Sequence, residues 1–247
     1  MSCLDYCVKV LINFADHNFR TSQKLNSQTG FEVGGFDRVI SYSPKDIDLS
    51  FFRKNIKILL NERGAGYWLW KPYIICKALK DVKEGDYVFY ADSGSFFVHS
   101  IEPIIDVANR YELDVIVFEN RRLEKKWTKR DAFILMNSDE PQYTDSWQRQ
   151  SGFTLWKKSH FSLEFAEQYL YYCQDERIVS DSPNTLGVPN YPEFVENRHD
   201  QSVLSLLAKK YNVPPFRFID QRGNKWFHLY QNSPYPQIMQ LTRRRDG

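Results

Sequence analysis

The stretch YVFYADSG, residues 87–94, decides how this sequence is interpreted. Its apolar and aromatic half is typical of a buried strand, and the strand pattern ends at a single carboxylate, Asp92, which small residues follow. Many α/β enzymes present a metal ligand in this way, at the carboxyl end of a strand and next to a phosphorylated substrate. We therefore expect Asp92 to bind a divalent cation. The plainer alternative is that Asp92 opens a Ser-Gly turn.

Length and composition set the class of protein. The chain has 247 residues, which suits one large α/β domain, and 42% of them are hydrophobic, which is enough for a full core. Aromatic residues make up 16%, and such residues either fill a core or stack on sugar rings. The net charge is only +2, whereas nucleic-acid-binding proteins usually carry a strong basic excess. We therefore expect no nucleic-acid partner.

Cysteine spacing and hydropathy indicate in which part of the cell the protein is expected. The four cysteines lack the paired spacing of a zinc site, so reduced thiols are expected. No apolar run approaches the ~20 residues of a membrane span, and the start of the chain lacks a secretory signal pattern. We expect a cytoplasmic protein. Residues 243–247 form a basic tail, which we expect to be solvated, with at most peripheral contact to an anionic membrane surface.

Hydrophobic periodicity predicts alternating strands and helices in the first half of the chain. Strands are expected at residues 7–14, 38–42, 87–91 and 114–118, with helical patterns at 16–28, 49–60, 72–79 and 98–111. This alternation predicts βαβ units and a mainly parallel sheet. After about residue 120 the order is less regular. There we expect a strand at 153–156, helices at 162–173 and 203–211, and a long loop at 178–197.

Four segments, taken together, resemble a known family. They are RGAGYWLWKP at 63–72, YADSG at 90–94, QSGF at 150–153 and HDQS at 199–202. In this order they resemble bacterial-type glycosyltransferases of the A-type nucleotide-sugar fold, which build capsule and lipopolysaccharide chains. The family's Asp-x-Asp metal motif is represented here by Asp92-Ser93-Gly94, with one carboxylate instead of two.

The resemblance implies both a fold and an activity. The fold is a single α/β domain over residues 1–242, Rossmann-like, with a mainly parallel central sheet flanked by helices. Its donor-binding part covers about residues 1–120 and its acceptor-side part about residues 121–242. The activity is transfer of a sugar from a nucleotide-diphosphate donor, such as a UDP-sugar, to a hydroxyl of a glycan or lipid-linked acceptor. The expected location stays the cytoplasm, and a place at the inner face of the membrane is left open.

The donor side needs positive charge and close approach of the backbone. A departing diphosphate is stabilised by Mg²⁺ or Mn²⁺, with Asp92 as the main protein ligand. Ser93 is expected to hydrogen-bond the ribose or the sugar, and Gly94 to leave room for the sugar.

Two further segments are assigned to the donor. Gly66 allows the backbone to approach the ligand, and Arg63 and Lys71 neutralise phosphate. Ser151 and Gly152 let the chain pass close beneath the donor sugar. The plainer alternatives are a helix start at Lys71 and a strand-entry turn at Ser151-Gly152.

Two carboxylates compete for the catalytic role. Asp200 takes the proton of the acceptor hydroxyl or stabilises positive charge at the anomeric carbon, and Asp131 is the alternative base. Each has the alternative of capping a helix. Retaining and inverting chemistry both stay open. His199 and His228 are candidates for additional metal ligands, and a structural histidine is the alternative for each.

Two other classes of function stay open on the sequence. The first is a metal-dependent phosphoesterase or nuclease that uses Asp92, Asp200 and a histidine. The second is a non-catalytic module that binds nucleotide-sugars, which the single carboxylate of the 92–94 segment would suit.

Overall fold

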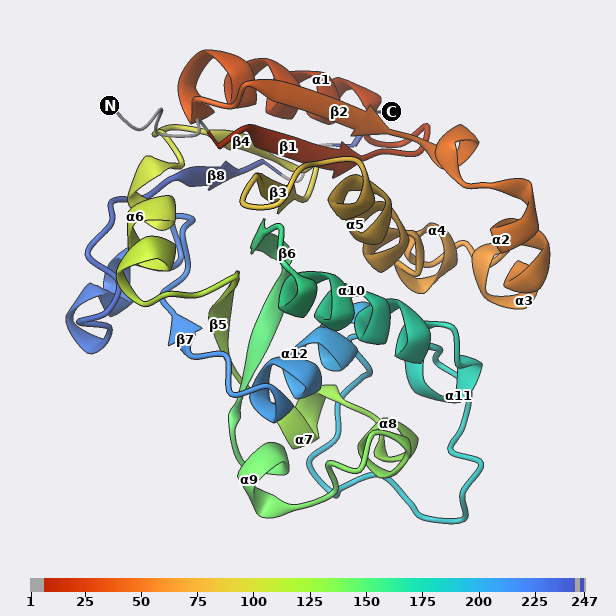
Figure 1. The fold of residues 1–247 in the computed structure, drawn as a ribbon. Coiled ribbons are helices and arrows are strands. Elements are labelled where there is room, and N and C mark those ends of the chain that lie inside the picture. The colour runs from red at the N-terminus through yellow and green to blue at the C-terminus, as the bar shows by residue number, and fades with distance from the viewer. Residues whose placement is uncertain (1–6, 243–244, 247) are drawn as a thin grey trace.

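The computed structural model describes residues 7–242 and 245–246 (Figure 1). Its centre is a six-stranded sheet in the order β2-β1-β3-β6-β5-β7, and a separate two-stranded sheet pairs β4 with β8. The strands are β1 (Lys9–Phe14), β2 (Arg38–Tyr42), β3 (Tyr87–Ala91), β4 (Ser95–Phe97), β5 (Val115–Leu123), β6 (Trp147–Lys157), β7 (Pro215–Phe216) and β8 (Met239–Leu241).

The six-stranded sheet is mixed and mostly parallel. β1 is parallel to β2 and β3, and β5 is parallel to β7. β6 runs antiparallel between β3 and β5 and therefore crosses the middle of the sheet. The predicted α/β fold with a mainly parallel sheet flanked by helices is confirmed. The expected strand at 153–156 is only the second half of β6, because its first half is polar: Gln148, Gln150 and Ser151 are nevertheless buried there.

Helices connect and cover the strands. The predicted helix at 49–60 is divided in two at Asn55, and the predicted loop at 178–197 is preceded by a short helix. The helices are α1 (Arg20–Thr29), α2 (Leu49–Lys54), α3 (Ile56–Leu59), α4 (Gly64–Tyr67), α5 (Trp70–Lys80), α6 (Glu102–Arg110), α7 (Glu124–Trp127), α8 (Arg130–Leu135), α9 (Pro141–Thr144), α10 (His160–Cys173), α11 (Glu176–Val179) and α12 (Asp200–Lys210), with shorter turns η1 (Gly30–Gly34), η2 (Pro44–Asp46) and η3 (Asn224–Leu229).

The sheet separates two hydrophobic cores, because side chains alternate along each strand. In β1, Val10 and Ile12 face a core shared with α5, α10 and α12, whereas Leu11 faces a core shared with α6. Figure 1 shows α5, α10 and α12 stacked together, with α6 apart from them. Both faces of the central strands are thus covered, which explains why β1 and β3 are near-continuous apolar runs.

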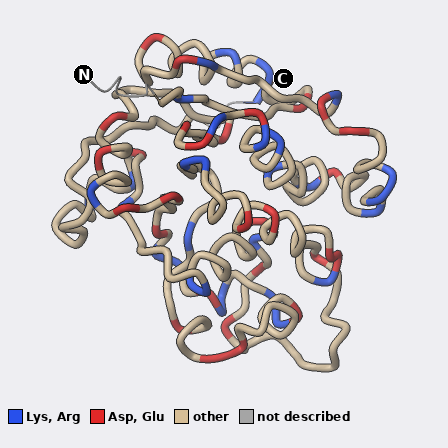
Figure 2. The backbone as a smooth tube through the Cα atoms, viewed as in Figure 1, with Lys and Arg blue, Asp and Glu red and all other residues tan. Residues whose placement is uncertain are grey.

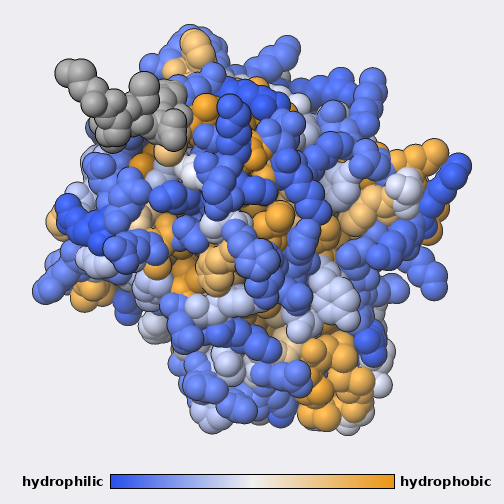
Figure 3. All heavy atoms as spheres, in the orientation of Figure 1, coloured by the Kyte–Doolittle hydropathy of each residue, from blue (hydrophilic) through white to orange (hydrophobic). Residues whose placement is uncertain are grey.

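The surface agrees with the near-neutral composition. Lys and Arg are interspersed with Asp and Glu along the backbone (Figure 2), and the face in Figure 3 is mostly hydrophilic with several hydrophobic patches. Across residues 7–242 and 245–246, no helix is long and apolar enough to span a membrane. Part of the expected solvated tail is not free in solvent: Asp246 accepts a hydrogen bond from the backbone N–H of Thr21. Residues 243, 244 and 247 of that tail lie outside the described residues.

Candidate active site

Asp92 lies at the carboxyl end of β3, as predicted. Its backbone N–H donates to the carbonyl oxygen of Gly152 (2.8 Å), which fixes it beside β6. A Cβ atom at residue 152 would lie 2.8 Å from Asp92 Oδ2, so glycine is needed to leave space for the carboxylate. Tyr90 donates a hydrogen bond to Asp92 Oδ1 (2.7 Å), and the Asp92 side chain is 46% exposed. The carboxylate is therefore oriented by the fold but open to a ligand.

Ser93 and Gly94 connect this strand end to its neighbours. The Ser93 hydroxyl donates a hydrogen bond to the carbonyl oxygen of Phe14 (2.6 Å), and this bond joins the ends of β3 and β1. The Gly94 carbonyl accepts a hydrogen bond from the backbone N–H of Thr242 (2.9 Å), which brings the end of the chain to the same edge. Ser93 thus has a role in the fold, and only its lone pairs are left for the predicted contact with a donor.

Lys71 is the central cation of the site. It lies in the first turn of α5 and is only 2% exposed. Its Nζ atom lies 3.0 Å from Asp200 Oδ2 and 3.4 Å from Asp92 Oδ1, and it donates to Ser151 Oγ (3.1 Å). Burial works against the ammonium, but the two carboxylates outweigh burial and raise the pKa of Lys71. The predicted helix start is correct, yet the side chain is buried between two carboxylates rather than solvated.

Asp200 is held from two sides. Besides Lys71, the hydroxyl of Tyr169 donates a hydrogen bond to Asp200 Oδ2 (2.8 Å). Burial, followed by the charge of Asp200, raises the pKa of Tyr169 well above its usual value, so the phenol keeps its proton and stays a donor. Asp200 is the first residue of α12, but its carboxylate contacts α5 and α10 instead of capping its own helix. The geometry therefore favours the interpretation of Asp200 as a site residue over a simple cap.

The segment 63–70 forms an unusual wall next to these carboxylates. Five consecutive residues, 64–68, have positive φ angles, and α4 is irregular for this reason. Gly66 is essential here, since a Cβ atom would lie 2.7 Å from the Cα atom of Leu59. Arg63 forms ion pairs with Glu196 (2.8 Å) and Asp181 (3.2 Å), which anchor the wall to the loop before α12.

These elements surround a cavity of about 950 Å³ at the carboxyl ends of β1 and β3. A cavity of this size accommodates a small-molecule substrate or cofactor, and in open α/β sheets this edge is where ligands bind. Nine of the predicted site residues line it: Arg63, Lys71, Asp92, Ser93, Gly94, Ser151, Gly152, His199 and Asp200.

Three predicted residues are not brought to the cavity. Gly66 lies behind its wall and supports the backbone. Asp131, in α8, is fully buried, and its carboxylate accepts hydrogen bonds from the backbone N–H (2.6 Å) and hydroxyl (2.9 Å) of Thr185. Asp131 therefore anchors a loop and does not reach the cavity as a base would. His228 lies in η3, also away from the cavity.

The predicted metal ligands do not form a cluster. Asp92 and His199 line the cavity while His228 does not. Among residues 7–242 and 245–246, no group of three or more His, Cys, Asp or Glu side chains is arranged to hold a metal ion. Mg²⁺ can, however, be held by one or two carboxylates together with substrate phosphates. Asp92 fits such a site, because its side chain is 46% exposed and lines the cavity.

Sequence reasoning missed several lining residues. Arg198 directly precedes the predicted His199-Asp200 pair, so its position next to that pair could have marked it as a lining residue. Arg222 and Arg245 come from the irregular last part of the chain, where no periodic pattern marked them. The last residue of β1 and the segment that follows it also contribute aromatic and polar side chains to the cavity lining. The missed lining residues include Phe14, Asp16, Asn18, Phe19, Arg198, Arg222 and Arg245.

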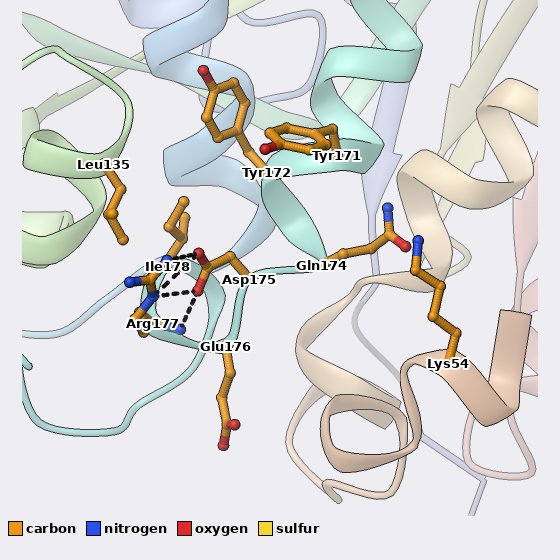
Figure 4. A pocket seen from close by; sticks show the side chains of 9 residues that line it. All are labelled: Lys54, Leu135, Tyr171, Tyr172, Gln174, Asp175, Glu176, Arg177 and Ile178. Carbon is orange, nitrogen blue, oxygen red and sulfur yellow. Dashed lines mark hydrogen bonds and ion pairs between the residues drawn. The ribbon is translucent and has the colours of Figure 1, made fainter.

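A second, smaller cavity of about 410 Å³ lies near α10 and α11 (Figure 4). Lys54 and Gln174 lie on one side of it and the rings of Tyr171 and Tyr172 on another (Figure 4). Arg177 is paired there with Asp175 (2.6 Å). The predicted site residues are absent from its lining. The larger cavity is therefore the candidate active site.

Comparison with solved structures identifies the class of fold. The sequence matches no protein family model and no curated protein. The structure is similar to mouse xyloside xylosyltransferase 1 in its apo form, with a TM-score of 0.52 and 9% sequence identity over 95% of this chain and 97% of that one. The bifunctional glycosyltransferase WbbM in its apo form aligns with a TM-score of 0.45 and 11% identity over 83% of this chain and 38% of that one. The alignment with the xylosyltransferase shows that this chain shares its α/β fold, the A-type fold of glycosyltransferase structures.

Proposed function

We propose that this protein is a glycosyltransferase that moves a sugar from a nucleotide-diphosphate donor, a UDP-sugar, to a hydroxyl of a glycan or lipid-linked acceptor. The observation that carries the proposal is the Lys71 ammonium between Asp92 and Asp200, in the lining of a cavity of about 950 Å³. The glycosyltransferase-type fold supports it, because the cavity lies at the strand edge where such a sheet binds nucleotides.

The cavity offers positive charge for the donor's diphosphate. Lys71 is already matched by two carboxylates. Arg222 is matched by one, Asp220 (2.5 Å), so the phosphates would be met mainly by arginines. Arg222 and Arg245 line the cavity from the C-terminal part of the chain, and Arg245 lies against the ring of Phe19 (5.7 Å). Arginine suits this role, because its planar guanidinium binds phosphate oxygens in pairs.

A divalent cation is part of the proposal. Mg²⁺ or Mn²⁺ would be held by Asp92 and would neutralise the charge that develops on the leaving diphosphate. Asp92 Oδ2 is the oxygen available for it, since Oδ1 faces Tyr90 and Lys71. Arg222 and Arg245 would then bind phosphate oxygens beside the same carboxylate.

Asp200 is the proposed catalytic carboxylate. Lys71 and Tyr169 both contact Oδ2 and so fix its orientation. A carboxylate held in this way serves either to accept the proton of the acceptor hydroxyl or to stabilise positive charge at the anomeric carbon. Both roles require the charge at this position, and neither requires Asp131.

The proposed acceptor class follows from the sequence resemblance, and the proposed location from the hydropathy of the sequence. We propose a growing surface polysaccharide, of the capsule or lipopolysaccharide type, as the acceptor. The proposed location is the cytoplasm, at the inner face of the membrane, with peripheral contact only.

A donor screen tests the proposal. The full chain is incubated with UDP-, GDP- and dTDP-sugars and Mn²⁺, and release of the nucleoside diphosphate is measured with and without a panel of glycan acceptors. Slow hydrolysis of one donor, accelerated by an acceptor, is the expected result. Binding of a donor without turnover would instead indicate a non-catalytic module, and cleavage of a nucleic-acid control would indicate a nuclease. Failure to bind any donor would overturn the proposal.

A further inference from the structure

Helices α2 and α3 lie at one edge of the molecule (Figure 1). Helical hydrogen bonds continue across the kink between them. The backbone N–H of Asn55 donates to the carbonyl oxygen of Phe51 (3.1 Å), and the backbone N–H of Leu59 donates to the carbonyl oxygen of Asn55 (3.0 Å). The two helices therefore follow one helical periodicity, in which side chains three, four or seven positions apart share a face.

The inner face of this segment packs on the body of the protein. Phe51 stacks on Tyr73 of α5, with ring centroids 4.3 Å apart. Asn55 and Ile58 are only 6% and 3% exposed. One face thus fixes the segment in place, and the opposite face is left to solvent. On a surface helix that opposite face normally carries polar side chains.

The outer face of α2 and α3 instead carries three large aliphatic side chains. Leu49, Ile56 and Leu60 are 60%, 43% and 68% exposed. Their spacing of seven and then four residues places them on one side of the helix. Figure 3 shows hydrophobic residues beside hydrophilic ones at this edge of the molecule. Single exposed aliphatic side chains are ordinary, but a group of them on one face indicates a contact surface.

Basic side chains accompany the aliphatic ones. Residues 49–61 include Arg53, Lys54 and Lys57 and no acidic residue. All three side chains are exposed, and none of them forms an ion pair within residues 7–242 and 245–246. Arg53 lies four residues after Leu49, and Lys57 lies three residues before Leu60. The cations therefore lie alongside the aliphatic side chains on the same face.

The acidic residues just before this segment do not offset its charge. Asp48 pairs with Lys77 (3.3 Å). Asp46 accepts hydrogen bonds from the backbone N–H and the hydroxyl of Ser43 (both 2.8 Å). Three basic residues and no acidic one give residues 49–61 a charge of +3, whereas the whole chain carries only +2. The positive charge of this face is therefore a local feature.

We propose that the outer face of α2 and α3 docks on an anionic membrane surface. Aliphatic side chains flanked by Lys and Arg are the combination that binds such a surface: the former enter the boundary of head groups and acyl chains, and the latter meet the lipid phosphates. A symmetric contact with a second copy of this chain is less favourable, because it would bring the same unpaired cations together. This docking face consists of Leu49, Arg53, Lys54, Ile56, Lys57 and Leu60.

The docking face is joined to the candidate active site along the chain. Leu60 is followed, after one residue, by Glu62, Arg63 and Gly64, which line the cavity of about 950 Å³. A molecule anchored in the membrane would therefore meet the cavity at this wall. On the proposed function, on which this one consequence rests, the acceptor is then a lipid-linked sugar and not a free glycan. The docking itself does not depend on the transfer reaction.

Sedimentation of the full chain with vesicles tests the inference. The vesicles consist of phosphatidylcholine alone or mixed with phosphatidylglycerol, and the bound fraction gives a partition coefficient. We expect binding to the anionic vesicles to be about 100-fold stronger and to weaken with added salt. Arg53→Gln combined with Lys54→Gln and Lys57→Gln should remove most of that difference. Ile56→Ser combined with Leu60→Ser should weaken binding to anionic vesicles at least about 10-fold.

Matched controls separate this face from the rest of the surface. Phe31→Ser removes a side chain that is 66% exposed, like Leu60, but lies next to Glu32. Neither this variant nor the charge control should change the partition coefficient by more than about 2-fold, because distant exposed charges are screened. Thermal melting first establishes that every variant is folded. The charge control replaces three exposed lysines elsewhere by glutamine: Lys24, Lys83 and Lys225.

Three results would overturn the inference. The first is an unmodified protein that does not bind anionic vesicles, and the second is an equal loss of binding in the docking-face variants and their controls. The third is a dimer, detected by analytical ultracentrifugation, that Ile56→Ser with Leu60→Ser dissociates, since a second copy would then cover this face. Vesicle binding needs no nucleotide-sugar, so each of these results leaves the proposed function standing. Conversely, failure of the donor screen would remove the lipid-linked acceptor and leave the docking face as proposed.

Discussion

The ammonium nitrogen of Lys71 lies 3.0 Å from Asp200 Oδ2, although the two residues are only 2% and 3% exposed. The same nitrogen lies 3.4 Å from Asp92 Oδ1, so one buried cation faces carboxylates from two other elements. An uncompensated charge at this depth is strongly unfavourable. The three side chains therefore act as one unit, and each of them affects the position and charge of the other two.

Removal of the cation should destabilise the fold. We expect Lys71→Met to lower the free energy of unfolding by about 3–5 kcal/mol, because Asp200 is left as a buried charge without its partner. Urea-induced unfolding, followed by circular dichroism, measures the change. The double variant Lys71→Met with Asp200→Asn should lose less than the sum of the two single variants, since the unpaired charge is then absent.

Lys80 provides the matched control for this prediction. It lies in the same helix and pairs with Glu167 (2.8 Å), but both side chains are about half exposed. Lys80→Met should therefore change the free energy of unfolding by no more than about 1 kcal/mol. Equal effects at positions 71 and 80 would contradict the interpretation of Lys71 as a buried, paired charge.

The pH dependence of the Lys71 contribution follows from its raised pKa. A lysine whose pKa is higher in the folded than in the unfolded protein contributes fully below the unfolded value of about 10.4 and loses that contribution as pH rises through the folded value. The difference in unfolding free energy between the unmodified protein and Lys71→Met should therefore be constant from pH 7 to about pH 9 and decline only above about pH 10. Urea unfolding at several pH values tests this. A decline of the difference below pH 9 would show that the folded protein does not hold the proton more tightly.

The parts of the fold that were predictable from the sequence are those with an apolar pattern. The run before Asp92 and the run ending at Phe14 identified β3 and β1, whose parallel pairing brings their carboxyl ends together. The first half of β6 was missed because its buried residues are polar and find partners only in the folded chain: Gln148, for example, donates to Glu124 Oε1 (2.9 Å). Periodicity cannot detect a strand that is stabilised in this way.

The candidate site was predictable where a motif marked it. Asp200 and Lys71 were each identified from local sequence, but their contact joins positions 129 residues apart, and no local pattern encodes it. Asp131 shows the opposite case. Its local pattern resembled a site residue, and the structure instead uses its carboxylate to hold the Thr185 segment. The difference between these two carboxylates lies in long-range contacts.

Thiol reactivity should divide the described cysteines into two groups. Burial raises the pKa of Cys76 to about 12 and that of Cys173 well above its usual value, whereas Cys7 is exposed. Because the thiolate is the reactive form, iodoacetamide at pH 8 should label Cys7 in the native protein and label Cys76 and Cys173 only after unfolding in urea. Peptide mass spectrometry gives the extent of labelling at each site. Rapid labelling of Cys173 in the native protein would contradict the packing of α10 against the Lys71–Asp200 pair.

Asp92 and Gly152 should depend on each other. Asp92→Asn keeps the shape of the side chain and removes its charge, so we expect nucleotide-sugar turnover to fall at least ~100-fold while the fold is retained. Gly152→Ala should cause a comparable loss, because the new Cβ atom would displace the carboxylate from 2.8 Å away. Turnover is measured by release of nucleoside diphosphate with Mn²⁺ and with EDTA. If Asp92→Asn retains near-normal turnover and unchanged sensitivity to EDTA, Asp92 is not the metal ligand.

Asp200 and Asp131 should respond differently to the same substitution. Asp200→Asn keeps the contact geometry but removes the charge beside the reaction centre, so donor affinity should stay nearly unchanged while turnover collapses. Asp131→Asn should instead lower the free energy of unfolding by about 1–3 kcal/mol. An amide oxygen in the place of Oδ2 still accepts from Thr185, but the amide nitrogen cannot accept the hydrogen bond that the Leu186 backbone N–H donates to Oδ1. Turnover per folded molecule should persist. Calorimetry, urea unfolding and nucleotide release on the same preparations give the three quantities. Loss of turnover at position 131 but not at position 200 would transfer the catalytic role to α8 and leave the donor site as described.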